Sequence, residues 1–178
     1  QGGIITDQEQ AIHTLSDLVD EMNRRYATLK LNKVSNIFEF NAKASASERL
    51  TFLWVIHDEF AEWMMTPNYA DAVSDVVGRL GVKARAAGIS LVFAAQRPDA
   101  TVMPMQLRAN LGYRLVLRVD SEGTSEFALG EKGAERLLGK GHLAAKLHGE
   151  DDLVIAQVPI IASDCLEAIV SELRVIFG

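Results

Sequence analysis

The feature that most constrains this fold is a short apolar run that ends in two acids. Residues 52–56 are Phe-Leu-Trp-Val-Ile, and His57, Asp58 and Glu59 follow them directly. A run this short that is apolar on both faces is typical of a central strand in a parallel sheet, not of a half-exposed strand. Open α/β sheets bind ligands beyond the carboxyl ends of their strands. We therefore expect Asp58 and Glu59 at a ligand-binding edge.

The acidic pair by itself has two interpretations. In nucleotide-hydrolysing motors, one carboxylate serves Mg²⁺ and the next one polarises the attacking water. Acids are also ordinary at the start of a helix, because they interact favourably with its dipole. Short apolar runs that end in Asp-Glu are common, so the pair alone does not decide between a nucleotide site and a helix start.

Composition limits the class of protein. The chain has 178 residues, 48% hydrophobic and 24% charged, which is typical of one soluble globular domain with its own core. Its apolar runs are far shorter than the roughly 18 residues that a membrane span needs, and no signal peptide is visible, so we expect a cytoplasmic protein. Cys165 is the only cysteine, which excludes an internal disulfide. The net charge of −6 argues against a broadly basic protein that coats DNA, although a ring with a locally basic pore is compatible with it.

Periodic patterns along the chain predict helices that alternate with strands. Helices are expected over about 7–31, 59–65, 68–87 with Gly88 as carboxyl cap, 131–138 and 163–177. Strands are expected over about 52–56, 89–95 and 114–119, with a hairpin of 142–147 and 153–158. This order predicts an α/β fold with a mostly parallel sheet, helices on its flanks and a β-hairpin near the carboxyl end.

Five segments carry a family likeness in a fixed order. They are residues 18–26, 55–65, 83–89, 94–98 and 133–141. In this order they resemble the carboxyl-terminal part of the FtsK/SpoIIIE-type DNA-pumping ATPase motor, and the resemblance covers about residues 5–160. It implies a partial RecA-like P-loop NTPase fold. It also implies a homohexameric ring that hydrolyses ATP with Mg²⁺ at its subunit interfaces and moves double-stranded DNA.

The resemblance implies roles for single residues. Asp58 would be the Walker B carboxylate that serves Mg²⁺, directly or through water, and Glu59 would be the general base that orients the attacking water. Gln96 would sense the γ-phosphate, because an amide can both donate and accept a hydrogen bond. Arg114 stands where the family places a candidate arginine finger, which would stabilise charge on a neighbouring subunit's nucleotide.

Several of these residues also have structural interpretations. Gln96 could cap a loop, and Arg114 could pair with a surface acid; without the resemblance these would be the favoured interpretations. His57 could tune the acidic pair, but a packed, hydrogen-bonded histidine is favoured. Trp54 and Trp63 are expected in the core or in a subunit interface, since no basic and aromatic interleaving of the single-strand binding type surrounds them.

The phosphate-binding loop of the family does not occur in this sequence. No Gly-x-x-x-x-Gly-Lys-Ser/Thr is found, and the glycines of 139–141 have the wrong spacing. In such a loop, backbone amides and a lysine hold the β- and γ-phosphates. We therefore expect residues 1–178 to be a single domain, the Walker B and sensor half of a motor. The full-length protein would be an ATPase. This fragment, which could be a monomer, is expected neither to bind ATP tightly nor to hydrolyse it alone.

The positions linked to DNA contact depart from the family pattern. Thr124-Ser125-Glu126 stands where the family has Asp-Ser-Arg, and the second loop, 148–152, is acidic. Carboxylates repel a phosphate backbone, which puts the usual grip on DNA in doubt. Arg97, Arg108 and Lys132 could supply different contacts.

Taken together, these features predict part of an ATP-driven double-stranded DNA translocase motor. The alternative is a non-catalytic, FtsK-like protein-interaction module of a DNA restriction, conjugation or secretion complex. Such a module would keep the fold and use its altered loops to bind a protein.

Overall fold

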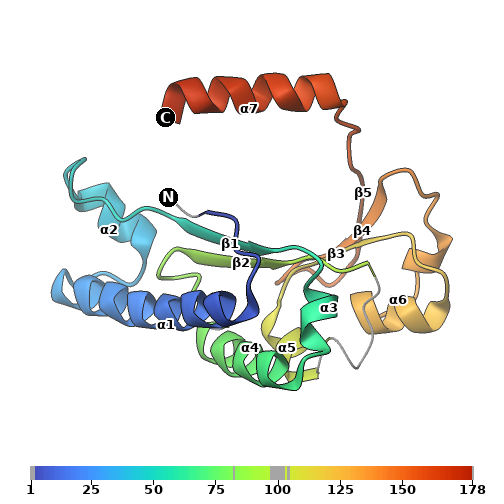
Figure 1. Cartoon of the computed structure of the whole chain (residues 1–178), viewed down its shortest axis with the longest axis horizontal. Coiled ribbons are helices and arrows are strands. Elements are labelled where there is room, and N and C mark those ends of the chain that lie inside the picture. The colour runs from blue at the N-terminus through green and yellow to red at the C-terminus, as the bar shows by residue number, and fades with distance from the viewer. Residues whose placement is uncertain (1–2, 82, 97–102, 104, 178) are drawn as a thin grey trace. The chain divides into compact units, whose positions relative to one another are not determined.

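The computed structural model describes residues 3–81, 83–96, 103 and 105–177. They form two compact units, Gln1–Gly112 and Tyr113–Gly178. The first unit contains a two-stranded parallel sheet, and the second contains a three-stranded antiparallel sheet (Figure 1). The predicted α/β class, with helices beside a parallel sheet and a hairpin near the carboxyl end, is confirmed, although the parallel sheet has two strands in the described residues and β3 belongs to the antiparallel sheet.

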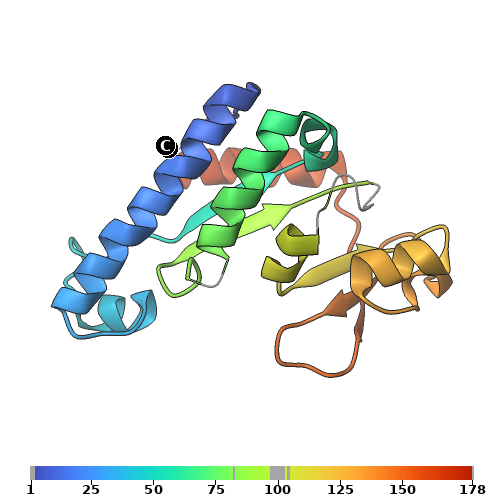
Figure 2. The same cartoon turned by 90° about the horizontal axis from the view of Figure 1, so that it is seen from below.

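The first unit places its two longest helices on one face of the parallel pair. Its helices are α1 (Gln8–Leu31), α2 (Ile37–Lys43), α3 (Phe60–Met64), α4 (Pro67–Leu80) and α5 (Met105–Asn110), and its strands are β1 (Leu53–His57) and β2 (Ile89–Phe93). Helices α1 and α4 lie side by side against the strands (Figure 2). The core between them is built from apolar side chains of α1, α3, α4 and the start of β2, including Leu15, Val19, Met22, Phe60, Tyr69, Val73, Val77, Leu80 and Ile89.

The expectation that β1 is buried on both faces is wrong for this chain. Its side chains alternate, and Trp54 and Ile56 are 67% and 70% exposed while Leu53 and Val55 pack against the core. The reason is that α1 and α4 cover one face of the pair only. Trp54 is therefore not a core residue of the described chain, whereas Trp63 is half-buried against the core.

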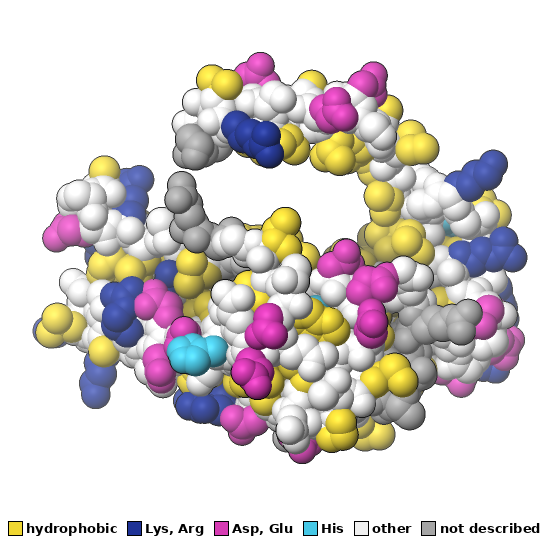
Figure 3. All heavy atoms as spheres, viewed as in Figure 1, with side chains coloured by type: hydrophobic (Ala, Val, Ile, Leu, Met, Phe, Trp, Pro, Cys, Tyr) yellow, Lys and Arg dark blue, Asp and Glu magenta, His cyan; other side chains and the backbone are white. Residues whose placement is uncertain are grey.

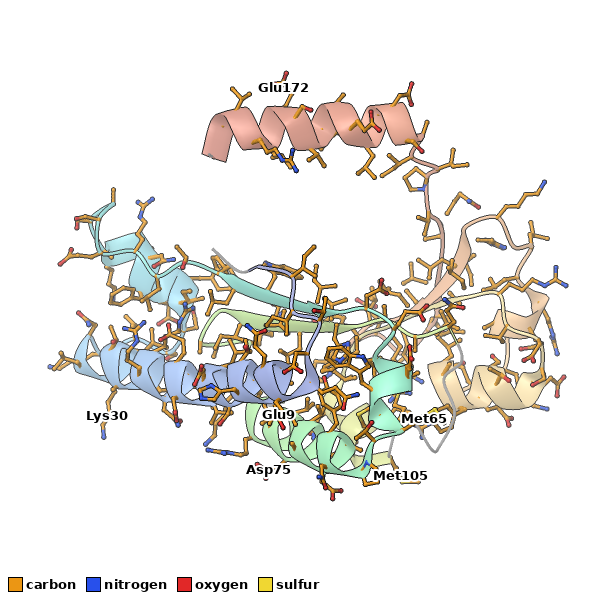
Figure 4. All side chains as sticks on the ribbon, viewed as in Figure 1. Glu9, Lys30, Met65, Asp75, Met105 and Glu172 are labelled. Atoms are coloured by element: carbon orange, nitrogen blue, oxygen red, sulfur yellow. The ribbon has the colours of Figure 1, made fainter. Side chains whose placement is uncertain are left out.

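Helix α1 follows the prediction closely, with a different residue at its start. The Asp7 carboxylate accepts a hydrogen bond from the backbone N–H of Gln10 and caps the helix. Glu9 in the first turn and Lys30 in the last turn have the charges that suit the helix dipole (Figure 4).

Helix α4 ends earlier than predicted. It stops at Leu80, and Gly81 forms its carboxyl cap, because glycine is a poor helix former and ends the helical run. Gly88 lies outside the helix, just before β2, with a φ of +75°. A Cβ on Gly88 would lie 2.4 Å from Cδ1 of Ile37, so the position needs both the left-handed backbone and the absence of a side chain.

A buried arginine connects α1 by hydrogen bonds to the residues that precede both strands. Arg25 is 3% exposed, and its guanidinium donates to the backbone carbonyls of Thr51 and Ala87, both at 2.8 Å. It also donates to the Glu21 carboxylate at 2.7 Å. The neighbouring Arg24, 60% exposed, binds the same carboxylate through two nitrogens. Glu21 therefore binds two arginines, one buried and one exposed.

The Glu21 site makes stability depend on pH. The hydrogen bond from Arg24, helped by Arg25, lowers the pKa of Glu21 from 4.5 to about 2. A carboxyl whose pKa is lower in the folded state stabilises the fold above its ordinary pKa, and loses that contribution as pH falls through its folded pKa. We expect the free energy of unfolding to fall between pH 4.5 and 2, and Glu21→Gln to remove part of that slope. Denaturant titrations at a series of pH values measure it; equal slopes in both proteins would contradict the assignment.

The second unit is built on the hairpin. It comprises β3 (Arg114–Leu117), α6 (Glu122–Leu129), a short 3-10 helix η1 (Ala134–Arg136), β4 (His142–Lys146), β5 (Val154–Gln157) and α7 (Ser163–Phe177). The predicted hairpin and last helix are confirmed, and the strand predicted at 114–119 pairs antiparallel with β4. The helix predicted over 131–138 is wrong, since only the turn η1 forms there, and α6 was not predicted. Hydrophobic side chains are exposed along α7 (Figure 3).

Candidate functional site

The acidic pair leaves β1 at the open end of the parallel pair. His57 is paired with Phe93 in register, and two backbone hydrogen bonds continue past the strands: Ala94 N–H to the His57 carbonyl at 2.9 Å, and Phe60 N–H to the Ala94 carbonyl at 3.2 Å. These bonds hold the segment after β2 beside the segment after β1. Asp58 and Glu59 are exposed at this rim, as the sequence predicted.

Three of the predicted site residues come together at this rim. The side-chain amide of Gln96, which is also exposed, donates a hydrogen bond to Oε1 of Glu59. Oδ1 of Asp58 accepts the backbone N–H of Glu59 at 3.0 Å. The two carboxylates and the amide thus form one connected cluster that opens to solvent.

Glu59 has a strained backbone at this point. Its φ and ψ are 51° and 35°, in the left-handed region that residues other than glycine rarely adopt. Glu59 occupies the N-cap position of α3, yet its side chain makes no capping bond to that helix and turns to Gln96 instead. The interpretation of Glu59 as a plain helix start is therefore disfavoured. Strained residues of this kind concentrate at functional sites.

His57 connects the rim to the core. Its Nε2 lies 2.5 Å from the hydroxyl of Tyr69 on α4, and its Nδ1 lies 3.1 Å from the backbone carbonyl of Asp58. The expected packed, hydrogen-bonded histidine is confirmed, and burial lowers the pKa of its imidazole. Sequence reasoning missed Tyr69. It stands four residues before Val73, and this helical spacing was the signal for a core-facing side chain.

Mg²⁺ fits this rim only together with a nucleotide. Among the residues that the structure describes, no group of three or more His, Cys, Asp or Glu side chains could hold a metal ion. Mg²⁺ in phosphoryl-transfer sites commonly takes one or two carboxylates and completes its shell with phosphate oxygens and water. Asp58 offers such a carboxylate at an exposed position. The donor set therefore suits a phosphate-bound Mg²⁺ and not a metal cage made of protein alone.

The structure describes three of the other four predicted residues. Arg114, on β3 in the second unit, donates to the Leu129 carbonyl at 3.2 Å. Arg108 lies on α5 in the first unit, and Arg97 lies outside the described residues. Lys132 donates to the Glu122 carboxylate at 2.5 Å, and this contact, with Glu126 and Glu135 nearby, raises its pKa.

Solved structures identify the class of fold. The conjugation coupling protein TcpA of pCW3, in a monomer form with ATPγS, is similar with a TM-score of 0.84 and 30% identity, over 97% of this chain and 51% of that one. The type VII secretion ATPase EccC of Thermomonospora curvata, at 23% identity and a TM-score of 0.69, is similar in fold over 96% of this chain and 21% of that one. The fold is that of P-loop ATPase motor domains.

Sequence relatives narrow the class to one family. The model of the FtsK/SpoIIIE family matches residues 2–100. The DNA translocase FtsK of Campylobacter jejuni is 37% identical over 173 residues, and that of Streptococcus pneumoniae is 38% identical over 179 residues. Each match covers 96% of this chain but only 18% and 23% of the respective relative. The chain belongs to the FtsK/SpoIIIE family, which confirms the resemblance seen in its sequence.

In the described part of the chain, no helix combines the length and the apolar character that crossing a bilayer requires.

Proposed function

We propose that this chain is the Walker B and sensor half of an ATP-driven motor that translocates double-stranded DNA. One observation carries the proposal: the Gln96 amide is bonded to the Glu59 carboxylate, next to Asp58, at the open end of a parallel pair. Family membership supports it, because the relatives with 37% and 38% identity are DNA translocases. In this proposal the full-length protein forms a homohexameric ring in the cytoplasm, and both units belong to one motor domain.

The three rim residues divide the work of hydrolysis. Asp58 would hold Mg²⁺, directly or through water, and Mg²⁺, when bound, neutralises charge on the phosphates of ATP. The Glu59 carboxylate would accept a proton from the attacking water, which is the role of a general base. Gln96 holds that carboxylate in one direction through its amide N–H and would meet the γ-phosphate as the state of the nucleotide changes.

Nucleotide binding also needs a phosphate cradle, which this sequence does not contain. Backbone amides and a lysine supply most of the contacts to the β- and γ-phosphates in P-loop proteins. We therefore propose that the 178-residue chain alone neither binds ATP tightly nor hydrolyses it, and that the cradle is supplied by other parts of the full-length protein.

DNA contact is the weakest part of the likeness to a chromosome motor. Lys132 is held by Glu122 among further carboxylates, which argues against a free phosphate contact. Glu126, where the family has arginine, is exposed on α6 and adds negative charge. Arg97 and Arg108 stay as proposed contacts. The competing proposal is a non-catalytic FtsK-like interaction module of a DNA restriction, conjugation or secretion complex. The acidic residues of α6 and of the loop 148–152 support it, because they suit a protein partner better than a phosphate backbone.

The experiment that separates these proposals is ATP hydrolysis by the full-length protein with and without duplex DNA. The motor predicts hydrolysis that duplex DNA stimulates; a module predicts none. Arg114→Ala, mixed in equal amounts with wild type, is expected to lower the rate to well below half, because in a ring whose sites hydrolyse ATP in turn one site that lacks its neighbour's arginine finger also stalls the other sites. Arg118→Ala, an exposed arginine just after the same strand, is the matched control and should leave the mixture unaffected. A rate proportional to the wild-type fraction in both mixtures would contradict the finger.

A further inference from the structure

A chain of hydrogen bonds runs from the core of the first unit to the acidic rim. It begins at Tyr69, which is 1% exposed on α4, and passes through the His57 imidazole to the backbone carbonyl of Asp58. On the far side of the same peptide group, the N–H of Glu59 is bound by Oδ1 of Asp58. Both ends of the peptide group between residues 58 and 59 are therefore held.

The chemistry of the groups fixes the direction of each bond. A backbone carbonyl can only accept, so the Nδ1 of His57 must carry the proton that reaches Asp58. In a neutral imidazole the other nitrogen is then an acceptor, and the Tyr69 hydroxyl donates to it. Burial raises the pKa of Tyr69 to about 12, which keeps this hydroxyl protonated at neutral pH.

Aromatic packing holds the imidazole itself in place. The rings of Trp63, Tyr69, Phe93 and Phe60 surround it, with centroids 5.2, 5.8, 6.0 and 6.1 Å away. These side chains come from α3, α4 and β2, so three elements fix one ring. A ring fixed in this way gives the Asp58 carbonyl a rigid partner.

We propose that His57, oriented by Tyr69, is a positioning residue that clamps the peptide between Asp58 and Glu59 and so aims both carboxylates. The clamp maintains the left-handed backbone of Glu59. Such a backbone costs free energy, so it persists only where surrounding contacts hold it. The direction of that backbone decides whether the Glu59 side chain meets Gln96. The proposal rests on the function proposed above, because aiming the carboxylates matters only if they take part in hydrolysis.

The kinetic test uses the full-length protein. Tyr69→Phe removes only the hydroxyl, and we expect kcat for ATP to fall roughly 10-fold. His57→Leu removes both hydrogen bonds of the imidazole, and we expect kcat to fall roughly 100-fold. KM should change little in both variants, because the misplaced carboxylates act in the hydrolysis step. His57→Asn is expected to restore most of kcat, because its amide N–H can reach the Asp58 carbonyl. The matched control is Tyr26→Phe, which also removes one tyrosine hydroxyl bond, in this case to the backbone carbonyl of Lys83 at 2.9 Å.

A second readout does not depend on ATP hydrolysis. Hydrogen exchange of the nucleotide-free full-length protein, followed by mass spectrometry, reports on the Glu59 amide through peptides that span 57–61. Tyr69→Phe should raise deuterium uptake there several-fold, and Tyr26→Phe should not. Unchanged uptake in Tyr69→Phe, or equal loss of kcat in Tyr26→Phe, would overturn the positioning role. If Tyr69→Phe raises the deuterium uptake but Glu59→Gln keeps full ATPase activity, the positioning role of His57 stands and the proposed function is overturned instead.

Discussion

Glu59→Gln in the full-length protein is expected to lower kcat for ATP hydrolysis on the order of 10³-fold, the middle of the range for a general base. The substitution keeps the size of the side chain and its hydrogen bonding, but the neutral amide cannot accept a proton from water. ATP binding should persist, because the phosphate contacts are made elsewhere. Phosphate release measures the rate, and a fluorescent ATP analogue measures the affinity.

The control for this substitution lies one helical turn away. Glu62→Gln changes the same residue type at an exposed position of α3, outside the cluster of Asp58, Glu59 and Gln96. Its kcat should stay within about twofold of wild type, since surface substitutions away from a site have small effects. The 178-residue chain alone serves as the blank. Equal rates for wild type and Glu59→Gln would show that Glu59 is not the general base.

Arg25→Met is expected to be the most destabilising substitution proposed for this chain, at about 2–4 kcal/mol. It leaves the buried carbonyl of Ala87 and the part-buried carbonyl of Thr51 without their guanidinium partner, and leaving buried polar groups unpaired is costly. The matched control is Arg24→Met, which removes an exposed contact to the same Glu21 and should cost about 1 kcal/mol or less.

Fluorescence during urea denaturation measures both changes in the relevant unit. The chain has two tryptophans, Trp54 and Trp63, and both lie in the first unit with Arg25. A matching loss of stability in Arg24→Met and Arg25→Met would show that the charge pair with Glu21 matters and the buried carbonyl bonds do not.

The rim of the candidate site was predictable from the sequence because it depends on local patterns. Two apolar runs that each end in polar residues place Asp58, Glu59 and Gln96 at one end of a parallel pair, and the register of β1 and β2 bears this out. The roles of these residues in hydrolysis stay predictions. The hydrogen bond between Tyr69 and His57 could not be predicted from the sequence, because it depends on which side chain of α4 meets His57 in three dimensions.

The wrong predictions have physical reasons of the same kind. The exposed side chains of Trp54 and Ile56 reflect which face the helices cover, and an apolar run does not carry that information. Helix α6 contains Gly123, Thr124 and Ser125, which rank below most residues in helix propensity, so its intrinsic propensity is poor. It is stabilised by its Ser121 cap and by the buried hydroxyl of Ser125, which donates to the Glu131 carbonyl at 2.8 Å. Tertiary contacts of this sort override local preference.

The central claim is that Glu59 and Gln96 work as one unit, and a double-mutant cycle on kcat tests it most directly. Glu59→Gln, Gln96→Ala and the double variant are measured in the full-length protein under saturating ATP and duplex DNA. Residues that act together give non-additive effects. We predict that the double variant is no slower than Glu59→Gln alone, because the contact of Gln96 with the γ-phosphate would affect hydrolysis through the Glu59 carboxylate that Gln96 holds. Losses that multiply would show two independent residues and contradict the account.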